Sequence, residues 1–295
     1  MTAAEFDRWS VHSVAGFVRQ QVASGLQPEA EARRDAARVF AAQLPDGRDT
    51  EHHHVLRVQD PDAGATVGSL WLRVRPRAGE VEGYVFDVEL LPAARGRGLG
   101  RATMLAAHET ARALGATVMR LNVFGHNAPA IALYESLGYE VVDVSMQHRL
   151  DGPGDPVPLG RVVELRPMTS PEHTSFAARL PEHLAGLLTD GLATPGQLLW
   201  TAYEWTDPVG AVWLGLRDRS DGLHAFTHRL EVREDLRRRG YGRAVAVAVL
   251  RTCREMGVRT LGLSVAGADV PARRLCEELG LTLTAQTMVL PLTGP

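Results

Sequence analysis

The chain repeats itself, and the repeat keeps a constant spacing of 142 residues over most of each half. The motif Arg95-Gly96-Arg97-Gly98-Leu99-Gly100-Arg101 returns as Arg237-Arg238-Arg239-Gly240-Tyr241-Gly242-Arg243, and Leu137-Gly138 returns as Leu279-Gly280. Because matches in one register over such a length are hard to obtain by chance, we expect a tandem repeat of one domain. The predicted domains are residues 1–150 and 161–295, joined at residues 151–160 by a linker rich in proline and glycine.

Composition narrows the class of protein. The chain of 295 residues is long enough for two domains of ordinary size, and its formal net charge of −3 argues against a dedicated nucleic-acid binder. Two cysteines, Cys253 and Cys276, provide no disulfide framework, and no segment is typical of a signal peptide or a membrane span. We therefore expect a soluble cytoplasmic protein, a monomer or homodimer, without a nucleic-acid or membrane partner.

Hydrophobic periodicity predicts a similar order of elements in both halves. The first half is expected to have two helices within residues 3–42, strands at 54–60, 66–74 and 81–91, a helix at 102–114, a strand at 117–123, a helix at 128–137, and final strands at 139–144 and 146–150. The second half is expected to begin with a strand at 162–167, followed by mainly helical residues 171–188 and strands at 198–203, 210–216 and 226–232. The first half shows no counterpart of the strand at 162–167. The expected fold class is mixed α/β (α+β).

The glycine motif follows a predicted strand and leads into a predicted helix, an arrangement that favours anion binding. Glycines let backbone N–H groups converge on a phosphate, and the helix N-terminus and the arginines add positive charge. A dinucleotide-binding fingerprint would need glycine in place of Arg101, and a Walker loop would need a lysine, which this chain lacks entirely. A phosphorylated ligand of another kind is expected.

The pattern Arg95-x-x-Gly98-x-Gly100 resembles the pyrophosphate loop of the GNAT superfamily of N-acetyltransferases, and the segment from Asn122 through Asn127 and Tyr134 to Tyr139 resembles the closing motif of that family. The resemblance covers nearly the whole chain, twice. It implies two tandem domains, each with a mixed, splayed sheet in which the pantetheine arm of acetyl-CoA inserts between two parallel strands, here 85–91 and 117–123. It also implies direct transfer of an acetyl group to a primary amine on a small molecule or peptide.

The resemblance and the chemistry of the motif together assign cofactor-binding roles. Backbone N–H groups of residues 97–101 are expected to hold the pyrophosphate, and an N–H group near Leu90 to polarise the thioester carbonyl. The residues expected at acetyl-CoA are Val88, Leu90, Arg95, Gly96, Arg97, Gly98, Leu99, Gly100, Arg101, Asn122, Asn127 and Tyr134, with Arg237, Gly240 and Gly242 in the second copy. Helix capping alone is the alternative role for Asn127.

Catalysis needs a proton donor and a base. In the family, the tyrosine matching Tyr134 protonates the departing thiolate, and a phenol with an ordinary pKa near 10 suits a thiol leaving group. Asp87 and Glu89 alternate along a strand and share one side, and we favour Glu89 as the base for the amine. Glu82 and His126 remain candidates, and a solvated or substrate-binding strand face is the alternative.

Two further patterns limit the chemistry. Successive strand residues point in opposite directions, so that His52-His53-His54 predicts the entrance of a strand and no metal site. In the second copy Cys276 stands at the position of Tyr134, while Asp269, Ser264 and Arg229 replace Asn127, Asn122 and Asp87. The second copy is therefore expected to be degenerate and mainly structural. A non-catalytic protein that binds acyl-CoA for sensing or regulation is the alternative function.

Overall fold

The computed structural model describes residues 1–25, 27–152 and 160–292. The chain forms two compact units, Met1–Val144 with Thr284–Pro295, and Ser145–Leu283. These boundaries differ from the predicted domains 1–150 and 161–295 because the C-terminal segment joins the first unit and the end of the first repeat joins the second. Most of the predicted linker, residues 153–159, lies outside the described residues.

The first unit places two helices before a mixed sheet. Its elements are α1 (Ala3–Ala23), α2 (Glu29–Gln43), β1 (His53–Gln59), β2 (Thr66–Arg77), β3 (Glu80–Leu90), α3 (Leu99–Ala113), β4 (Val118–Phe124) and α4 (Ala128–Ser136), and it is completed by most of β11 (Thr282–Pro291). The strand order is β1-β2-β3-β4-β11, and of these neighbouring pairs only β3 and β4 are parallel.

The second unit repeats this plan with two differences: it begins with an additional strand, β6, and the two helices that follow this strand are shorter. Its elements are β6 (Glu164–Pro167), α5 (Ser170–Ala177), α6 (Glu182–Ala185), β7 (Gln197–Glu204), β8 (Asp207–Arg219), β9 (Gly222–Val232), α7 (Tyr241–Glu255), β10 (Val258–Ala266) and α8 (Val270–Glu278). The strand order is β5-β10-β9-β8-β7-β6, where β5 is Glu140–Arg149, the last strand of the first repeat. The mixed α/β fold class and the tandem repeat are confirmed.

Each unit is thus completed by the final strand of the other repeat. In the second unit the N–H group of Leu150 donates to the carbonyl oxygen of Arg259 at 2.8 Å. In the first unit the N–H group of Leu292 donates to the carbonyl oxygen of Thr117, also at 2.8 Å. The two bonds occupy equivalent positions at the spacing of 142, so the repeats have exchanged their last strands. The two short strands predicted at 139–144 and 146–150 are one continuous strand, β5, and the division between the two units falls within it.

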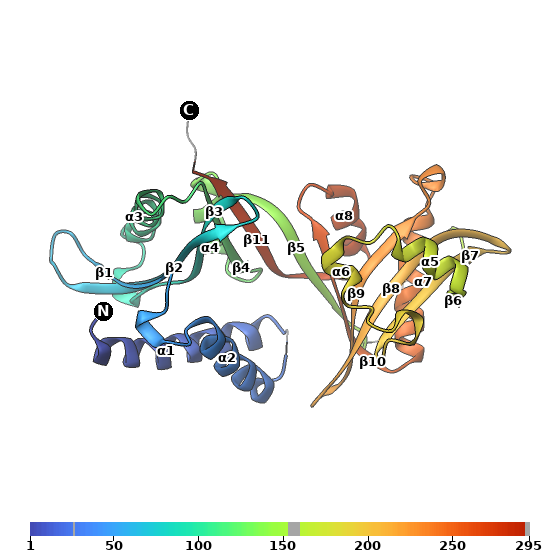
Figure 1. The fold of residues 1–295 in the computed structure, drawn as a ribbon, viewed down its shortest axis with the longest axis horizontal. Helices are drawn as coiled ribbons and strands as arrows, with labels where there is room; N and C mark the ends of the chain where they lie inside the picture. Colours follow the sequence, from blue (N-terminus) through green and yellow to red (C-terminus); the bar gives the residue numbers. More distant parts are fainter. Residues whose placement is uncertain (26, 153–159, 293–295) are drawn as a thin grey trace. The chain divides into compact units, whose positions relative to one another are not determined.

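The sheet of the first unit has a different core on each face (Figure 1). On one face α3 covers a cluster of buried apolar side chains, which includes Leu72, Val85, Met104, Met119, Leu121 and Met288. On the other face α1 and α2 cover an aromatic cluster, in which Trp9, Phe40, Trp71 and Phe86 are in contact. Strand residues alternate between these two faces, so that Leu70 and Leu72 on β2 lie in the first cluster and Trp71 between them lies in the aromatic cluster.

A β-bulge interrupts the alternation in β3. Trp71 pairs with Asp87 but the next residue, Leu72, pairs with Val85, so that Phe86 is an extra residue on β3. Such a bulge shifts the alternation by one residue. Glu82, Tyr84 and Phe86 before the shift therefore share a face with Asp87 and Glu89 after it, and this is the face covered by α1 and α2.

The parallel strands β3 and β4 separate partway along their length. Their pairing ends at Val85 and Leu121, although β3 continues to Leu90 and β4 to Phe124. In the second unit the pairing of β9 and β10 ends at Thr227 and Leu263, although these strands continue to Val232 and Ala266. The splay implied by the sequence is present in both units.

The exchange of strands predicts the behaviour of the isolated first repeat. A fragment of residues 1–150 lacks β11, whose Met288 is fully buried in the first core. Because Met146 on β5 is the equivalent of Met288, we expect two copies of the fragment to exchange β5 strands and form a dimer, measured by light scattering after gel filtration. A matched fragment that joins residues 1–144 to residues 282–292 through a flexible linker should be a monomer. A monomeric 1–150 fragment as thermally stable as the matched one would contradict the role of β11.

Candidate active site

The splay leaves one edge of β3 facing a gap. The N–H group of Leu91 donates to the carbonyl oxygen of Val67 on β2 at 2.8 Å. Successive N–H groups along a strand point to opposite sides, so those of Leu90 and Val88 point away from β2, toward the separated end of β4. These are the two strand residues predicted to contact acetyl-CoA, and their orientation suits that role.

The glycine loop leaves the N-terminus of α3 open. Gly98 precedes the helix in a left-handed conformation, with φ of 77°, and no side chain caps the helix. The N–H groups of Leu99, Gly100 and Arg101 are therefore available to an anion. At the position of Gly96 (φ of 75°) the second repeat has Arg238 with φ of 59°, a conformation that costs a non-glycine residue roughly 1 kcal/mol.

The three arginines predicted to neutralise phosphate differ in their contacts. Arg97 donates from Nη2 to the buried carboxylate of Asp60 at 2.8 Å, so its charge is already paired. Arg95 donates from Nε to the carbonyl oxygen of Leu90 at 3.0 Å, and Arg101 donates from Nη1 to Oγ of Ser136 at 2.9 Å. Because these two acceptors are uncharged, Arg95 and Arg101 retain their charge for a ligand. In the second unit Nε of Arg237, the equivalent of Arg95, donates to the carbonyl oxygen of Val232 at 3.3 Å.

Two predicted asparagines have structural contacts of their own. Asn127 caps α4, where its Oδ1 accepts the N–H of Ala130 at 3.3 Å, and Asp269 caps α8 in the same way. Asn122 is exposed and donates from Nδ2 to Oγ1 of Thr287 on β11 at 3.3 Å. Capping accounts for Asn127, and a cofactor role for either residue stays a prediction.

Tyr134 projects from α4 into the core beside the splay. It is only 6% exposed, and its ring centroid lies 5.7 Å from that of Tyr139. Burial and the negative charge of Asp87 raise the pKa of Tyr134 to about 12, above the value near 10 assumed from the sequence. The phenol is therefore fully protonated at neutral pH.

Asp87 and Glu89 both face α1, as the alternation predicted. Oγ of Ser13 donates to Oδ2 of Asp87 at 2.6 Å, and Nε2 of His12 lies 2.9 Å from Oε2 of Glu89. Burial and the charge of Glu89 raise the pKa of Asp87, although the bond from Ser13 opposes them. Sequence reasoning missed His12 and Ser13; the only signal was a pair of polar residues within an amphipathic helix.

The other candidate bases are occupied elsewhere. Glu82 is 2% exposed and accepts from three guanidinium groups, those of Arg120 at 2.8 Å, Arg77 at 2.9 Å and Arg73 at 3.4 Å. Its charge is therefore compensated. His126 lies 2.5 Å from the side-chain oxygen of Gln20 and is exposed. Among the described residues, no group of three histidine, cysteine or carboxylate side chains is placed to hold a metal ion.

In the described part of the second unit, different side chains stand at the positions of Tyr134 and Asp87. Cys276 replaces Tyr134, and burial raises the pKa of its thiol to about 11. Glu231, the equivalent of Glu89, accepts from Arg179 at 2.7 Å and from Arg229 at 2.8 Å. Burial opposes them, but the two arginines hold the pKa of Glu231 below its usual value. The degenerate chemistry expected for the second copy stays a prediction, and these contacts favour it.

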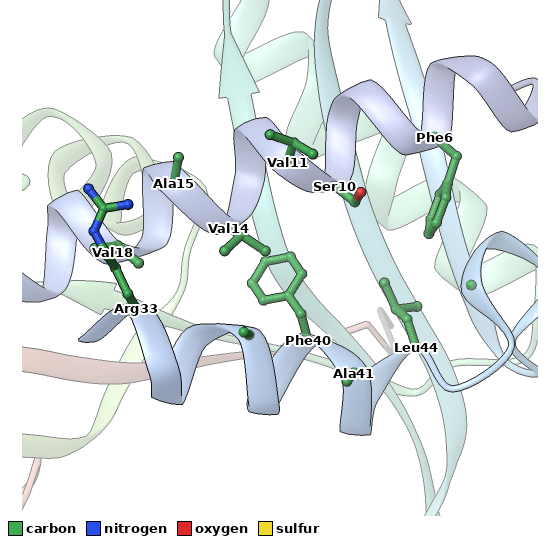
Figure 2. Close-up of a pocket in the computed structure, with 12 residues that line it drawn as sticks. Phe6, Ser10, Val11, Val14, Ala15, Val18, Arg33, Phe40, Ala41 and Leu44 are labelled. Atoms are coloured by element: carbon green, nitrogen blue, oxygen red, sulfur yellow. The ribbon is translucent and has the colours of Figure 1, made fainter. Parts of the chain in front are cut away.

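An apolar cavity of about 560 Å³ lies between α1 and α2 (Figure 2). Phe6, Val14, Phe40 and Leu44 contribute to its lining, and Arg33 is the one charged residue that lines it. No carboxylate or tyrosine lines this cavity, so it holds no candidate catalytic group.

No helix in the described parts of the chain is both long and apolar enough to cross a membrane.

Known proteins resemble both halves. The family described as "Acetyltransferase (GNAT) family" matches residues 20–139 and 163–281. The protein named "Uncharacterized N-acetyltransferase YdgE" of Bacillus subtilis is 33% identical over 150 residues, which cover 51% of this chain and 95% of YdgE. Mycothiol acetyltransferase of Beutenbergia cavernae is 45% identical over 91 residues, 31% of this chain and 30% of that protein. A GCN5-related N-acetyltransferase from Sphaerobacter thermophilus has the same fold, with a TM-score of 0.57 at 20% identity over 97% of this chain and 92% of its own.

The contacts of Glu82 predict its effect on stability. In the variant Glu82→Gln the buried guanidinium of Arg73 loses its carboxylate, so we expect a loss of about 3 kcal/mol in the free energy of unfolding. Urea denaturation measures this loss. Glu80→Gln, at the exposed end of the same strand, is the matched control and should change stability by less than about 0.5 kcal/mol. Equal effects of the two substitutions would show that the ion pairs of Glu82 contribute nothing.

Proposed function

Because the chain belongs to the acetyltransferase (GNAT) family, we propose that its N-terminal unit transfers an acetyl group from acetyl-CoA to a primary amine by direct attack. One observation carries the proposal. The pairing of β3 and β4 ends at Val85 and Leu121. Among the residues that the structure describes, only the N-terminal unit has beside this splay a tyrosine, Tyr134, together with a carboxylate that no described arginine pairs with, Asp87. The supporting comparisons establish an acetyltransferase family, and the donor and acceptor are part of the proposal.

The residues of the splay fit acetyl-CoA. Its pantetheine arm carries amide groups, which the outward-pointing N–H groups of Val88 and Leu90 are able to bind. Its pyrophosphate matches the N–H groups of residues 99–101 and the charges of Arg95 and Arg101. Bound acetyl-CoA supplies an activated acyl group and a thiolate leaving group. The N–H of Leu90 is suited to stabilise negative charge that develops on the acyl oxygen.

We assign the general base to Asp87 rather than to Glu89, which the sequence favoured. Asp87 is the carboxylate that raises the pKa of Tyr134, and its own pKa is raised by burial and by Glu89, as suits a base that works near neutral pH. When Asp87 accepts a proton from the ammonium group of the acceptor, its negative charge disappears. The pKa of Tyr134 then falls, and the phenol becomes a stronger acid as the thiolate leaves.

The division of labour between the units has a direct test. We expect Tyr134→Phe to lower kcat by tenfold or more, because the thiolate loses its proton donor, while Cys276→Ala leaves kcat unchanged. Release of CoA in the presence of a panel of amines measures the rate. The opposite pattern would place the chemistry in the C-terminal unit. Tight binding of CoA without turnover of any amine would instead favour a sensor or regulatory protein.

The choice of base predicts two different pH profiles. We expect Asp87→Asn to lower kcat/KM by roughly a hundredfold or more, because the amine loses its proton acceptor. Glu89→Gln removes a negative charge that raises the pKa of Asp87, so the acid limb of its kcat/KM profile should move to lower pH with a smaller loss of rate. If Glu89→Gln abolished activity and Asp87→Asn did not, Glu89 would be the base.

A further inference from the structure

A group of arginines lies on the same face of the first sheet as Asp87. We call Arg73, Arg75, Arg77 and Arg120 the arginine cluster. The first three alternate along β2, and Arg120 lies on β4 beside Tyr84 of β3. Arg73, Arg77 and Arg120 all donate to Glu82, and Arg73 also lies over the rings of Tyr84 and Phe86.

The positive charge of the arginine cluster exceeds the negative charge that faces it. Four arginines face two carboxylates, Glu82 and the exposed Glu80, which is opposite Arg77 in the strand register. Burial and the charges of Arg73 and Arg75 lower the pKa of the neighbouring His53 to about 4, so this histidine is neutral and adds no charge. An excess of two positive charges therefore remains at this end of the sheet.

Part of the cluster lacks a partner within the described chain. Arg73 is 7% exposed, yet its Nε is buried without a hydrogen-bond acceptor. A buried, charged donor without a partner is costly, and it indicates that a ligand atom completes the site. The exposed Arg75 forms no ion pair with any described residue, and the hydroxyl of Tyr84 is likewise free to donate.

The fold does not require these residues. At the spacing of 142, the positions of Arg73, Glu82, Tyr84 and Arg120 are occupied in the second unit by Gly215, His224, Phe226 and Gly262. The strands there pair in the same register, with Gly215 opposite Phe226 and Phe226 beside Gly262. Of the four arginines, Arg75 and Arg77 have arginine equivalents there, Arg217 and Arg219, whereas Arg73 and Arg120 have none. The second unit therefore builds the same sheet without Arg73, Arg120 and Glu82, and these three residues are found in the unit that also has Tyr134 and Asp87.

The bulge at Phe86 sets the distance from the cluster to the base. Tyr84 and Asp87 lie opposite Arg73 and Trp71, which are two residues apart on β2, so they are separated by about 7 Å along the sheet. Without the extra residue the two side chains would point to opposite faces. An extended dipeptide has about this length.

We propose that the amine acceptor carries an oxyanion, either a carboxylate or a phosphate, and that the arginine cluster binds this group while the amine lies at Asp87. The inference rests on the proposed acetyltransferase function of the N-terminal unit. Guanidinium groups match the geometry of both oxyanions. A bound oxyanion reduces the excess positive charge and supplies an acceptor for Nε of Arg73. The cluster thus selects the acceptor by its charge and by the separation of its two ends.

The test compares acceptors that differ only in the oxyanion. The panel contains peptides of one to four residues with a free C-terminal carboxylate, the same peptides as C-terminal amides, and aminoalkyl phosphates of matched length. We expect kcat/KM for the best carboxylate or phosphate to exceed that of its neutral counterpart by tenfold or more. In the double variant Arg75→Gln/Arg77→Gln this ratio should fall to near one through a rise in KM. Arg217→Gln, at the equivalent exposed position of the second unit, is the control and should retain the ratio.

The outcomes separate the inference from the function on which it rests. Turnover of acids and amides at equal rates would overturn the inference and leave the acetyltransferase in place. A preference for acids that the double variant retains would also overturn it. If no amine in the panel were turned over, titration calorimetry with the acidic peptides decides: binding to the wild type that the double variant loses supports the arginine site, and no binding overturns it. A larger ratio for phosphates than for carboxylates would identify the oxyanion as a phosphate.

Discussion

The extra residue at Phe86 determines which side chains of β3 meet at the proposed site. The bulge moves Asp87 and Glu89 onto the face that carries Glu82, Tyr84 and the covering helices. It lies one residue beyond the point where β3 loses its partner β4. Loss of pairing frees backbone groups for a ligand, and the shift in alternation turns a carboxylate toward it. Both features occur again in the second unit, where His228 is the extra residue, so they belong to the fold and not to the chemistry of one half.

The two units therefore share one backbone scaffold, which carries a different set of side chains in each. Both have the open helix N-terminus after a left-handed glycine, and in both an arginine of the loop donates to the end of the preceding strand. They differ in the ionisable side chains that lie beside the separated strands. A tyrosine and a carboxylate without an arginine partner in the first unit correspond to a buried cysteine and an arginine in the second. Because the exchanged strands complete both cores, the last strand of the second repeat contributes Met288 to the core of the first unit.

Local patterns in the sequence predicted most of the helices and strands. They did not predict which strands pair when those strands are far apart in the sequence. Periodicity located the strands and helices, and the repeat revealed two equivalent units. It gave no sign that β5 and β11 change places, because the two strands are equivalent and each fits either sheet edge. The motif located Tyr134, but its raised pKa depends on burial and on Asp87, which are properties of the folded chain. The arginine cluster was not predicted either, since simple alternation places Tyr84 and Asp87 on opposite faces and only the bulge unites them.

The same low exposure that makes Tyr134 a weak acid allows a nearby charge to control it. A phenol with a pKa of about 12 donates poorly to a thiolate while Asp87 is ionised. Part of that high pKa comes from the charge of Asp87 itself, and a neighbouring charge acts strongly where water is excluded. In the reaction we propose, neutralisation of Asp87 by the proton of the amine would favour the next proton transfer, from Tyr134 to the leaving thiolate. Electrostatics would then set the order of the two proposed steps: the amine is deprotonated first, and only then does the phenol become an effective acid.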